Sequence, residues 1–227
     1  FYTSGDLLSA GKDGNPPLTP AGTAALLEAV ASGRLGFVGI HSAADTFHTG
    51  ETPATNTDQP RTWRYRTLGE HADPYLRMLG GELIVHGTQQ IARATVIDPT
   101  FPGFAGLGPH IELMGEWYSL TEFSENMRVL LRLETAAMRD PNANGTDWPP
   151  VGWDTPYQRP PFPNTWARQH GRGRVFYTAL GHREDAWLSE TFEKILFGGL
   201  DWVLRRVDAD VTPNFATATP GARELPP

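Results

Sequence analysis

The segment Leu35–Ala43, with the sequence LGFVGIHSA, indicates the fold more clearly than any other part of the chain. Residues 35–40 are all apolar or glycine, which is typical of a strand that is covered on both faces of a sheet. His41 is the first polar residue after this run. Residues just past the carboxyl ends of strands line the ligand crevice of an open α/β sheet. The segment therefore predicts a buried central strand that ends at a functional histidine.

A second segment, Gly173–His182, has the sequence GRVFYTALGH and repeats this arrangement. For either histidine alone, the simpler interpretation is a ring that is hydrogen-bonded to the backbone at the end of a strand. Two such histidines favour a shared reactive or ligating centre. Imidazole suits both roles, because its pKa lies near neutrality and its neutral form binds metals.

The composition narrows the classes of function. A chain of 227 residues is long enough for one well-buried core. Its formal charge of -7 argues against nucleic acid as a partner, because phosphate binding needs clustered Lys and Arg. The sequence contains no cysteine, which excludes disulfides, thiolate metal sites and a cysteine nucleophile. No apolar run approaches the roughly 20 residues that a bilayer span needs. These features are compatible with a protein of the cytoplasm, of the periplasm or of the secreted class.

Helical and strand patterns alternate along the chain, which predicts an α/β fold with a mainly parallel central sheet and flanking helices. Helices are expected from Thr19 and Pro20 to Gly33, over residues 71–79 and from about 189 to 206. Strands are expected over residues 35–40, 83–86, 92–97, 117–120, 129–133, 165–169 and 174–179. We expect the strands over 83–86 and 92–97 to form an antiparallel pair, and those over 165–169 and 174–179 to form a hairpin.

The rest of the chain has no clear periodicity. Residues 42–70 and 136–163 are long irregular stretches of the kind that often form lids or binding loops. We expect a single domain over residues 1–207 and an extended tail over 208–227. Phe1–Thr3 resemble the last residues of a strand, so further N-terminal sequence is expected before them.

Further polar residues lie close to the expected strand ends. His86 ends a short apolar strand and could reach the same crevice as a third ligand. Glu116 lies beside two aromatic residues that could tune its pKa for a role as base or ligand, although a surface glutamate would look the same. Asp45 and Glu184 lie within a few residues of the key histidines. Each could orient an imidazole or cap the start of a helix.

Aromatic residues cluster in the second irregular stretch and just after it. Sugar rings pack their C–H groups on flat aromatic faces, and Trp166, with Trp148, Trp153 and Tyr157 upstream, could supply such faces. The alternative is that these rings only anchor a proline-rich loop to the core. The sequence contains no P-loop, no G-x-G-x-x-G and no G-x-S-x-G motif.

Taken together, these segments resemble the ThuA-like family (trehalose-utilisation type) of the class I glutamine amidotransferase-like superfamily. The resemblance covers most of residues 1–206. It rests on residues 36–43, Tyr75 with 79–81, His86, Glu116–Tyr118, Trp166 and 173–182. Two positions depart from the family pattern: Gly115 stands where an acid is frequent, and Asn164-Thr165 precedes Trp166 where a proline is common.

The resemblance implies a flavodoxin-like, doubly wound fold, with earlier strand–helix units before Phe1. In amidotransferase relatives, a cysteine elbow and a later histidine form the glutaminase site. His41 and His182 stand near those two positions. Without any cysteine, the chain cannot hydrolyse glutamine by that route.

The resemblance also implies sugar catabolism, in particular of 3-keto-glycosides, with a divalent metal in some members. The hypothesis is an enzyme that cleaves an oxidised glycoside by acid/base chemistry. Its expected catalytic residues are His41, Glu116 and His182, its substrate-binding residues Asp45, Tyr118, Trp166 and Glu184, and its ligands for zinc, manganese or iron His41, His86 and His182. The alternatives are a non-catalytic carbohydrate-binding or scaffolding domain, and a domain that works only through a partner. A homo-oligomer is compatible with the sequence.

Overall fold

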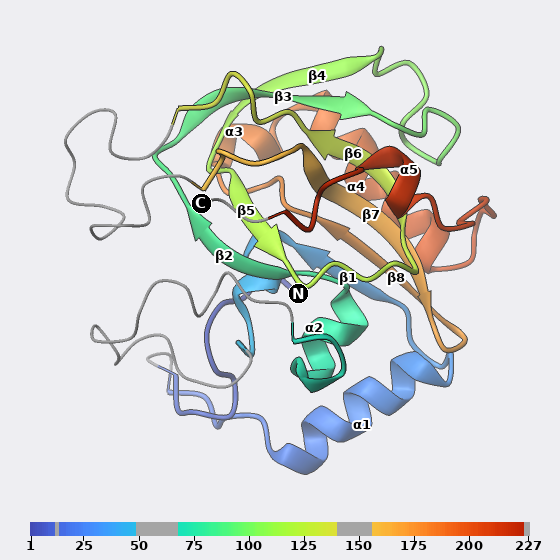
Figure 1. The fold of residues 1–227 in the computed structure, drawn as a ribbon. Helices are drawn as coiled ribbons and strands as arrows, with labels where there is room; N and C mark the ends of the chain where they lie inside the picture. The colour runs from blue at the N-terminus through green and yellow to red at the C-terminus, as the bar shows by residue number, and fades with distance from the viewer. Residues whose placement is uncertain (12–13, 49–67, 140–155, 225–227) are drawn as a thin grey trace.

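The computed structural model describes residues 1–11, 14–48, 68–139 and 156–224 (Figure 1). In this part of the chain, a six-stranded sheet has the order β1-β8-β7-β6-β3-β4, and a second sheet pairs β2 with β5. The strands are β1 (Phe37–Ile40), β2 (Glu82–His86), β3 (Gln90–Val96), β4 (His110–Gly115), β5 (Tyr118–Thr121), β6 (Arg128–Leu133), β7 (Phe162–His170) and β8 (Gly173–Thr178). The helices are α1 (Pro20–Ala31), α2 (Pro74–Leu79), α3 (Glu184–Trp187), α4 (Glu190–Val203) and α5 (Phe215–Ala218), with short 3-10 turns η1 (His41–Asp45) and η4 (Gly69–His71). The α/β fold class expected from the sequence is confirmed.

The parallel pair of β1 and β8 positions the site. Ile40 pairs with Thr178, so the two strands end side by side at the same edge of the sheet. The backbone of Phe1 exchanges hydrogen bonds with Val38 and Ile40 in the pattern of a further parallel neighbour. The segments that follow β1 and β8 therefore meet over one edge, as the sequence pattern predicts.

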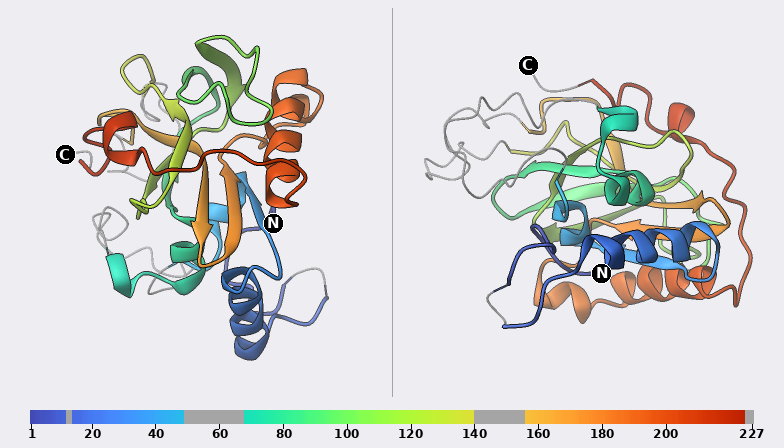
Figure 2. Two further views of the ribbon diagram at one scale, coloured as in Figure 1. Left: turned by 90° about the vertical axis from the view of Figure 1, so that its right-hand side faces the viewer. Right: turned by 90° about the horizontal axis from the view of Figure 1, so that it is seen from below.

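Helices cover both faces of this pair (Figure 2). On one face, Gly199 of α4 lies so close to the Phe176 ring that a Cβ atom would come within 2.6 Å of it. On the other face, Gly39 of β1 lies against Leu79 of α2, where a Cβ atom would come within 2.8 Å. The strands are thus buried on both sides, which explains their continuous apolar sequence.

The sheet is mixed, with more antiparallel than parallel pairs among the described strands, whereas the sequence predicted a mainly parallel one. Among the described strands, only β1 and β8 are parallel, and the other neighbours in the six-stranded sheet are antiparallel. The reason lies in how the strands are connected. A tight turn at Gly171 joins β7 to β8, and β3 and β4 are consecutive strands that pair with each other. Antiparallel strands need only short loops, whereas each parallel pair needs a long crossover.

The expected pairing of residues 83–86 with 92–97 is wrong. β2 pairs with β5 in the second sheet, while β3 lies between β6 and β4. Strand β4 had no counterpart in the expectations. The helix from Pro20, capped by the Thr19 side chain, and the hairpin of β7 and β8 are confirmed.

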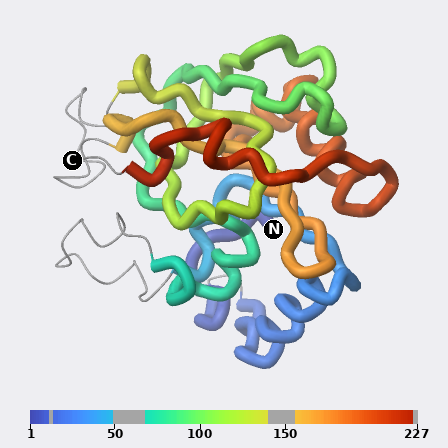
Figure 3. Tube along the Cα trace, turned by 45° about the vertical axis from the view of Figure 1, so that its right-hand side comes forward, coloured from blue at the N-terminus to red at the C-terminus, as the bar shows by residue number. Residues whose placement is uncertain are grey.

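The C-terminal segment, red in Figure 3, crosses the outside of the molecule and contains α5. Its apolar residues Phe215, Ala218 and Ala222 are buried, so this part of the expected extended tail is packed against the domain. The Asn214 side chain accepts a hydrogen bond from the Val129 N–H (2.7 Å) and donates one to the Val129 carbonyl (3.2 Å).

Within the described residues, every helix lacks either the length or the apolar character that a bilayer span requires.

Candidate active site

His41 follows β1 directly and has a positive φ of 44°. Such a backbone conformation costs a residue other than glycine roughly 1–3 kcal/mol, so the surrounding structure must hold it. The Tyr177 hydroxyl donates to the His41 carbonyl (2.9 Å), and Nδ1 of His41 donates to the Ala179 carbonyl (2.9 Å). The ring is almost fully buried and has one fixed orientation.

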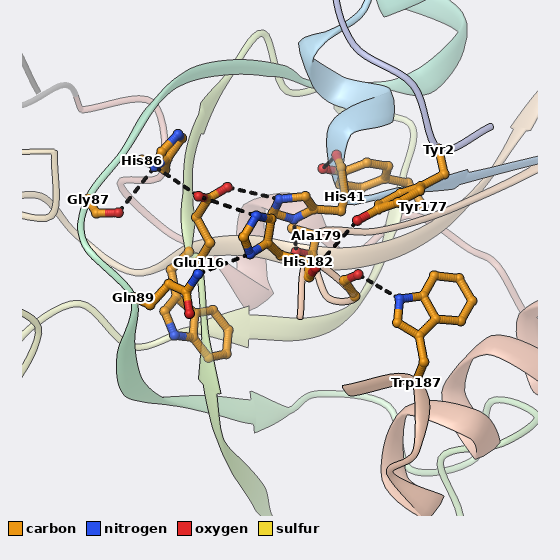
Figure 4. Close-up of polar contacts among 12 residues, drawn as sticks. Tyr2, His41, His86, Gly87, Gln89, Glu116, Tyr177, Ala179, His182 and Trp187 are labelled. Atoms are coloured by element: carbon orange, nitrogen blue, oxygen red, sulfur yellow. Dashed lines mark hydrogen bonds and ion pairs between the residues drawn. The ribbon is translucent and has the colours of Figure 1, made fainter. Parts of the chain in front are cut away.

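Glu116 lies between β4 and β5 and faces three imidazoles (Figure 4). Its Oε2 is 3.1 Å from Nε2 of His41. Its Oε1 is 3.4 Å from Nδ1 of His86 and 3.6 Å from Nε2 of His182. We call His41, His86, Glu116 and His182 the imidazole–carboxylate cluster. The structure thus brings together the histidine that ends β2 and the two that come after β1 and β8.

His182 lies at the open side of the cluster, with 36% of its side chain exposed, against 14% for Glu116 and 2% for His41. It follows a turn at Gly181, which has a φ of 102° and leaves no room for a Cβ atom against Phe192. The Gln89 side chain contacts Nδ1 of His182 at 3.4 Å and accepts a hydrogen bond of 2.6 Å from Arg183. Sequence patterns gave no signal for Gln89.

The contact between His41 and Glu116 requires a proton or a cation between the two side chains. Because Nδ1 of His41 donates its proton to a carbonyl oxygen, a neutral ring would turn the lone pair of Nε2 toward the carboxylate. Two acceptors 3.1 Å apart need either a proton or a metal ion between them. Ligand atoms of His41, Glu116 and His182 all lie within 4.8 Å of one another, so these residues fit a small cation.

The electrostatic environment separates the roles of the residues. Burial alone would raise the pKa of the Glu116 carboxyl, but the hydrogen bond from His41 and the charges of the imidazoles hold that pKa below its ordinary value. Desolvation lowers the pKa of His182, with His41 and His86 adding to the effect and Glu116 opposing it. Glu116 is therefore an anion near neutral pH, and His182 is suited to accept a proton.

Tyr118 was expected to bind substrate, but it is buried beneath the cluster. Its ring lies 4.0 Å from that of His41 and stacks on that of His86 at 5.9 Å, measured between ring centres. Burial, followed by the charges of Asp45 and Glu116, raises the pKa of Tyr118 well above its ordinary value. Tyr118 therefore supports the two imidazoles as a neutral phenol.

Asp45 contacts a different histidine from the one expected. Its carboxylate binds Nε2 of His48 (2.5 Å), and Nδ1 of His48 binds Glu82 (3.0 Å). This chain of contacts links η1 to β2. Asp45 therefore orients the ring of His48, and not that of His41 as the sequence suggested.

The expectation that Trp166 binds substrate is wrong, whereas the expectation for Glu184 stays a prediction. Trp166 is fully buried and donates to the Leu79 carbonyl (2.8 Å), so it is a core residue that no substrate can reach. Tyr157 is buried as well, and Trp148 and Trp153 lie outside the described residues. Glu184 is exposed in the first turn of α3. The side chains that contact the His182 ring include those of Glu116 and Gln89.

The space beside the cluster is small. A pocket of about 20 Å³ lies against Glu116, Gly181 and His182, which is room for a water molecule or a cation. A larger pocket of about 510 Å³ lies near α2 and is lined in part by Glu122 and Arg168, without any residue of the cluster. The chemistry of the side chains, rather than cavity size, identifies the site.

A chain with imidazoles and a carboxylate at the carboxyl edge of parallel strands belongs, by fold and site, with α/β proteins that bind ligands at that edge. The family model described as ThuA, trehalose utilisation, matches residues 6–203. The chain therefore belongs to the ThuA family, which is part of the class I glutamine amidotransferase-like superfamily.

One solved structure shares the fold of this chain, and two others are less similar to it. A ThuA-like protein from Bacteroides uniformis is 20% identical, with a TM-score of 0.52, over 82% of this chain and 65% of its own. The present chain thus spans less than two thirds of that relative. A ThuA-like protein from Parabacteroides merdae is 20% identical over 88% of this chain and 75% of its own, with a TM-score of 0.48. A cytoplasmic protein from Salmonella typhimurium is 15% identical over 85% and 63%, with a TM-score of 0.43. No curated protein matches the sequence.

Proposed function

We propose that this protein cleaves oxidised glycosides, namely sugars that carry a ketone at C3, by acid/base chemistry at the imidazole–carboxylate cluster. The observation that carries the proposal is the contact of Glu116 with three imidazoles from three strand ends. This centre combines the Glu116 carboxylate, a proton or cation between Glu116 and His41, and the partly exposed imidazole of His182. Membership of a family described by trehalose utilisation is consistent with a sugar substrate.

The reaction uses the acidity of the C2 proton, which the neighbouring ketone provides. His182 removes this proton, and the electrons of the C–H bond form an enolate between C2 and C3. The enolate expels the substituent at C1, and the His182 imidazolium returns the proton to the departing oxygen. Addition of water across the resulting C1–C2 double bond gives the free 3-keto sugar, so the net reaction is hydrolysis.

The other residues of the cluster set the charge around His182. Glu116 and Nε2 of His41 hold a proton or a cation between them, and the buried Tyr118 packs against the His41 and His86 rings. A divalent cation held by His41, Glu116 and His182 would supply a Lewis acid for the ketone oxygen, and a different base would then take the C2 proton.

The test follows a 3-keto-glucoside incubated with the pure protein, with and without a chelator. We expect His182→Ala to lower kcat at least ~100-fold, because general acid/base catalysis contributes about 10²–10⁴. His110→Ala, at an exposed position of β4, is the matched control and should keep full activity. Equal rates for wild type and His182→Ala would overturn the proposal. Sugar binding without product would instead favour the non-catalytic carbohydrate-binding alternative.

A further inference from the structure

Two exposed aromatic side chains flank His182, and neither was expected from the sequence. Tyr2 is 47% exposed and Trp187 is 44% exposed. Their rings contact each other edge to face, with ring centres 5.9 Å apart. Large aromatic side chains usually bury most of their surface. A pair that stays half exposed beside a reactive centre therefore points to a binding role.

The backbone of the His182 turn holds both rings in place. Nε1 of Trp187 donates to the Gly181 carbonyl (2.8 Å), and the Tyr2 hydroxyl donates to the His182 carbonyl at 3.5 Å. Trp187 also packs edge to face on the buried Phe192, with ring centres 5.1 Å apart. The position of the pair is therefore fixed relative to the imidazole of His182.

The pair is also close to the rest of the cluster. The Tyr2 ring lies 6.5 Å from the His41 ring, centre to centre. Burial raises the pKa of the Tyr2 hydroxyl, and the Glu116 charge adds to this effect. In Figure 4, Tyr2 and Trp187 lie on the side of His182 that faces away from His86 and Gln89.

Polar groups complete the surroundings. Gln89 and Arg183 are bonded to each other beside His182 and offer hydrogen-bonding groups at the surface. Ligand sites typically combine apolar or aromatic surface with a few such groups. A pyranose ring has this mixed character, because its C–H face packs on aromatic rings and its hydroxyls form hydrogen bonds.

We propose that Tyr2 and Trp187 form an aromatic subsite that binds a pyranose ring of the substrate next to His182. The proposal rests on the proposed function for the class of ligand. It replaces the buried Trp166 as the aromatic surface of the site.

The experiment compares aromatic and aliphatic replacements at each position. We expect Trp187→Phe and Tyr2→Phe to raise KM for a 3-keto-glucoside by at most about threefold, since both keep an aromatic face and lose only its hydrogen bond to the backbone at residues 181–182. Trp187→Leu and Tyr2→Leu should raise KM roughly tenfold, about 1.4 kcal/mol, with a smaller effect on kcat. Leu188→Ala changes the highly exposed neighbour of Trp187 and serves as the control. Thermal unfolding identifies any variant that fails to fold, and the other position then carries the test.

Calorimetric titration with the unoxidised glucoside separates this proposal from the proposed function. Loss of binding in both leucine variants supports the subsite even if the wild-type protein shows no turnover. Unchanged KM and unchanged binding in folded leucine variants would overturn the subsite and leave the catalytic proposal intact. A wild-type dimer that dissociates in Trp187→Leu, with sugar binding unaffected, would also overturn it.

Discussion

At the scale of single residues, Glu116 has the central place because one carboxylate faces three imidazoles. The sequence predicts His41 and His182 as neighbours because each comes soon after an apolar strand, whereas Glu116 was selected for the aromatic residues beside it, since its own strand β4 was not expected. It gives no signal for Tyr2 or Trp187, which contact backbone carbonyls of the turn at residues 181–182. It gives none for Gln89 either, which contacts the side chains of His182 and Arg183. Trp166 is the opposite case: the sequence suggested it as a binding surface, but an aromatic-rich sequence does not reveal which ring is buried.

Glu116→Gln tests the cation site at this scale. The change removes the charge with little change in shape, so the affinity for Mn²⁺ measured by calorimetry should fall at least tenfold, about 1.4 kcal/mol. Glu112→Gln on β4, where an exposed carboxylate pairs with Arg93, is the matched control and should bind Mn²⁺ as wild type does. Equal binding by Glu116→Gln and wild type, or none by wild type, would contradict the assignment of these ligands.

At the scale of elements, the central sheet depends on a side chain from the C-terminal segment. Strand β3 pairs with β6 only as far as residue 131, and Ile97 then bonds to Leu130. Beyond that point, the Asn214 amide pairs with the N–H and carbonyl of the buried Val129. The tail thus continues the pairing where a strand ends, which no local sequence pattern could indicate, since the contact joins residues 85 positions apart.

Asn214→Ala should lower the free energy of unfolding by about 1–3 kcal/mol, because it leaves two buried backbone groups without partners. Asn214→Asp should also destabilise the protein, since a carboxylate can accept from the Val129 N–H but places an oxygen against the Val129 carbonyl. Urea unfolding measures both changes. Thr217→Ala, at an exposed position of α5, should shift stability by less than about 0.5 kcal/mol. Wild-type stability in Asn214→Ala would show that the tail is not part of the cooperative fold.

At the scale of the whole molecule, segments far apart in the chain converge at one edge of the sheet. His41 and His182 reach it because β1 and β8 are parallel and end in register. This feature could be predicted from the apolar runs before each histidine. The antiparallel extension of the sheet and the separate pairing of β2 with β5 could not, because short apolar strands carry no information about which neighbour they choose.

The central claim is that these distant segments act as one reaction centre. Its most direct test is kcat/KM on a 3-keto-glucoside for wild type, Glu116→Gln, His182→Ala and the double variant. Residues that act as a unit have strongly non-additive effects. The kcat/KM of the double variant should therefore be within about threefold of that of the less active single variant. Losses that multiply, or single variants as active as wild type, would contradict a shared centre.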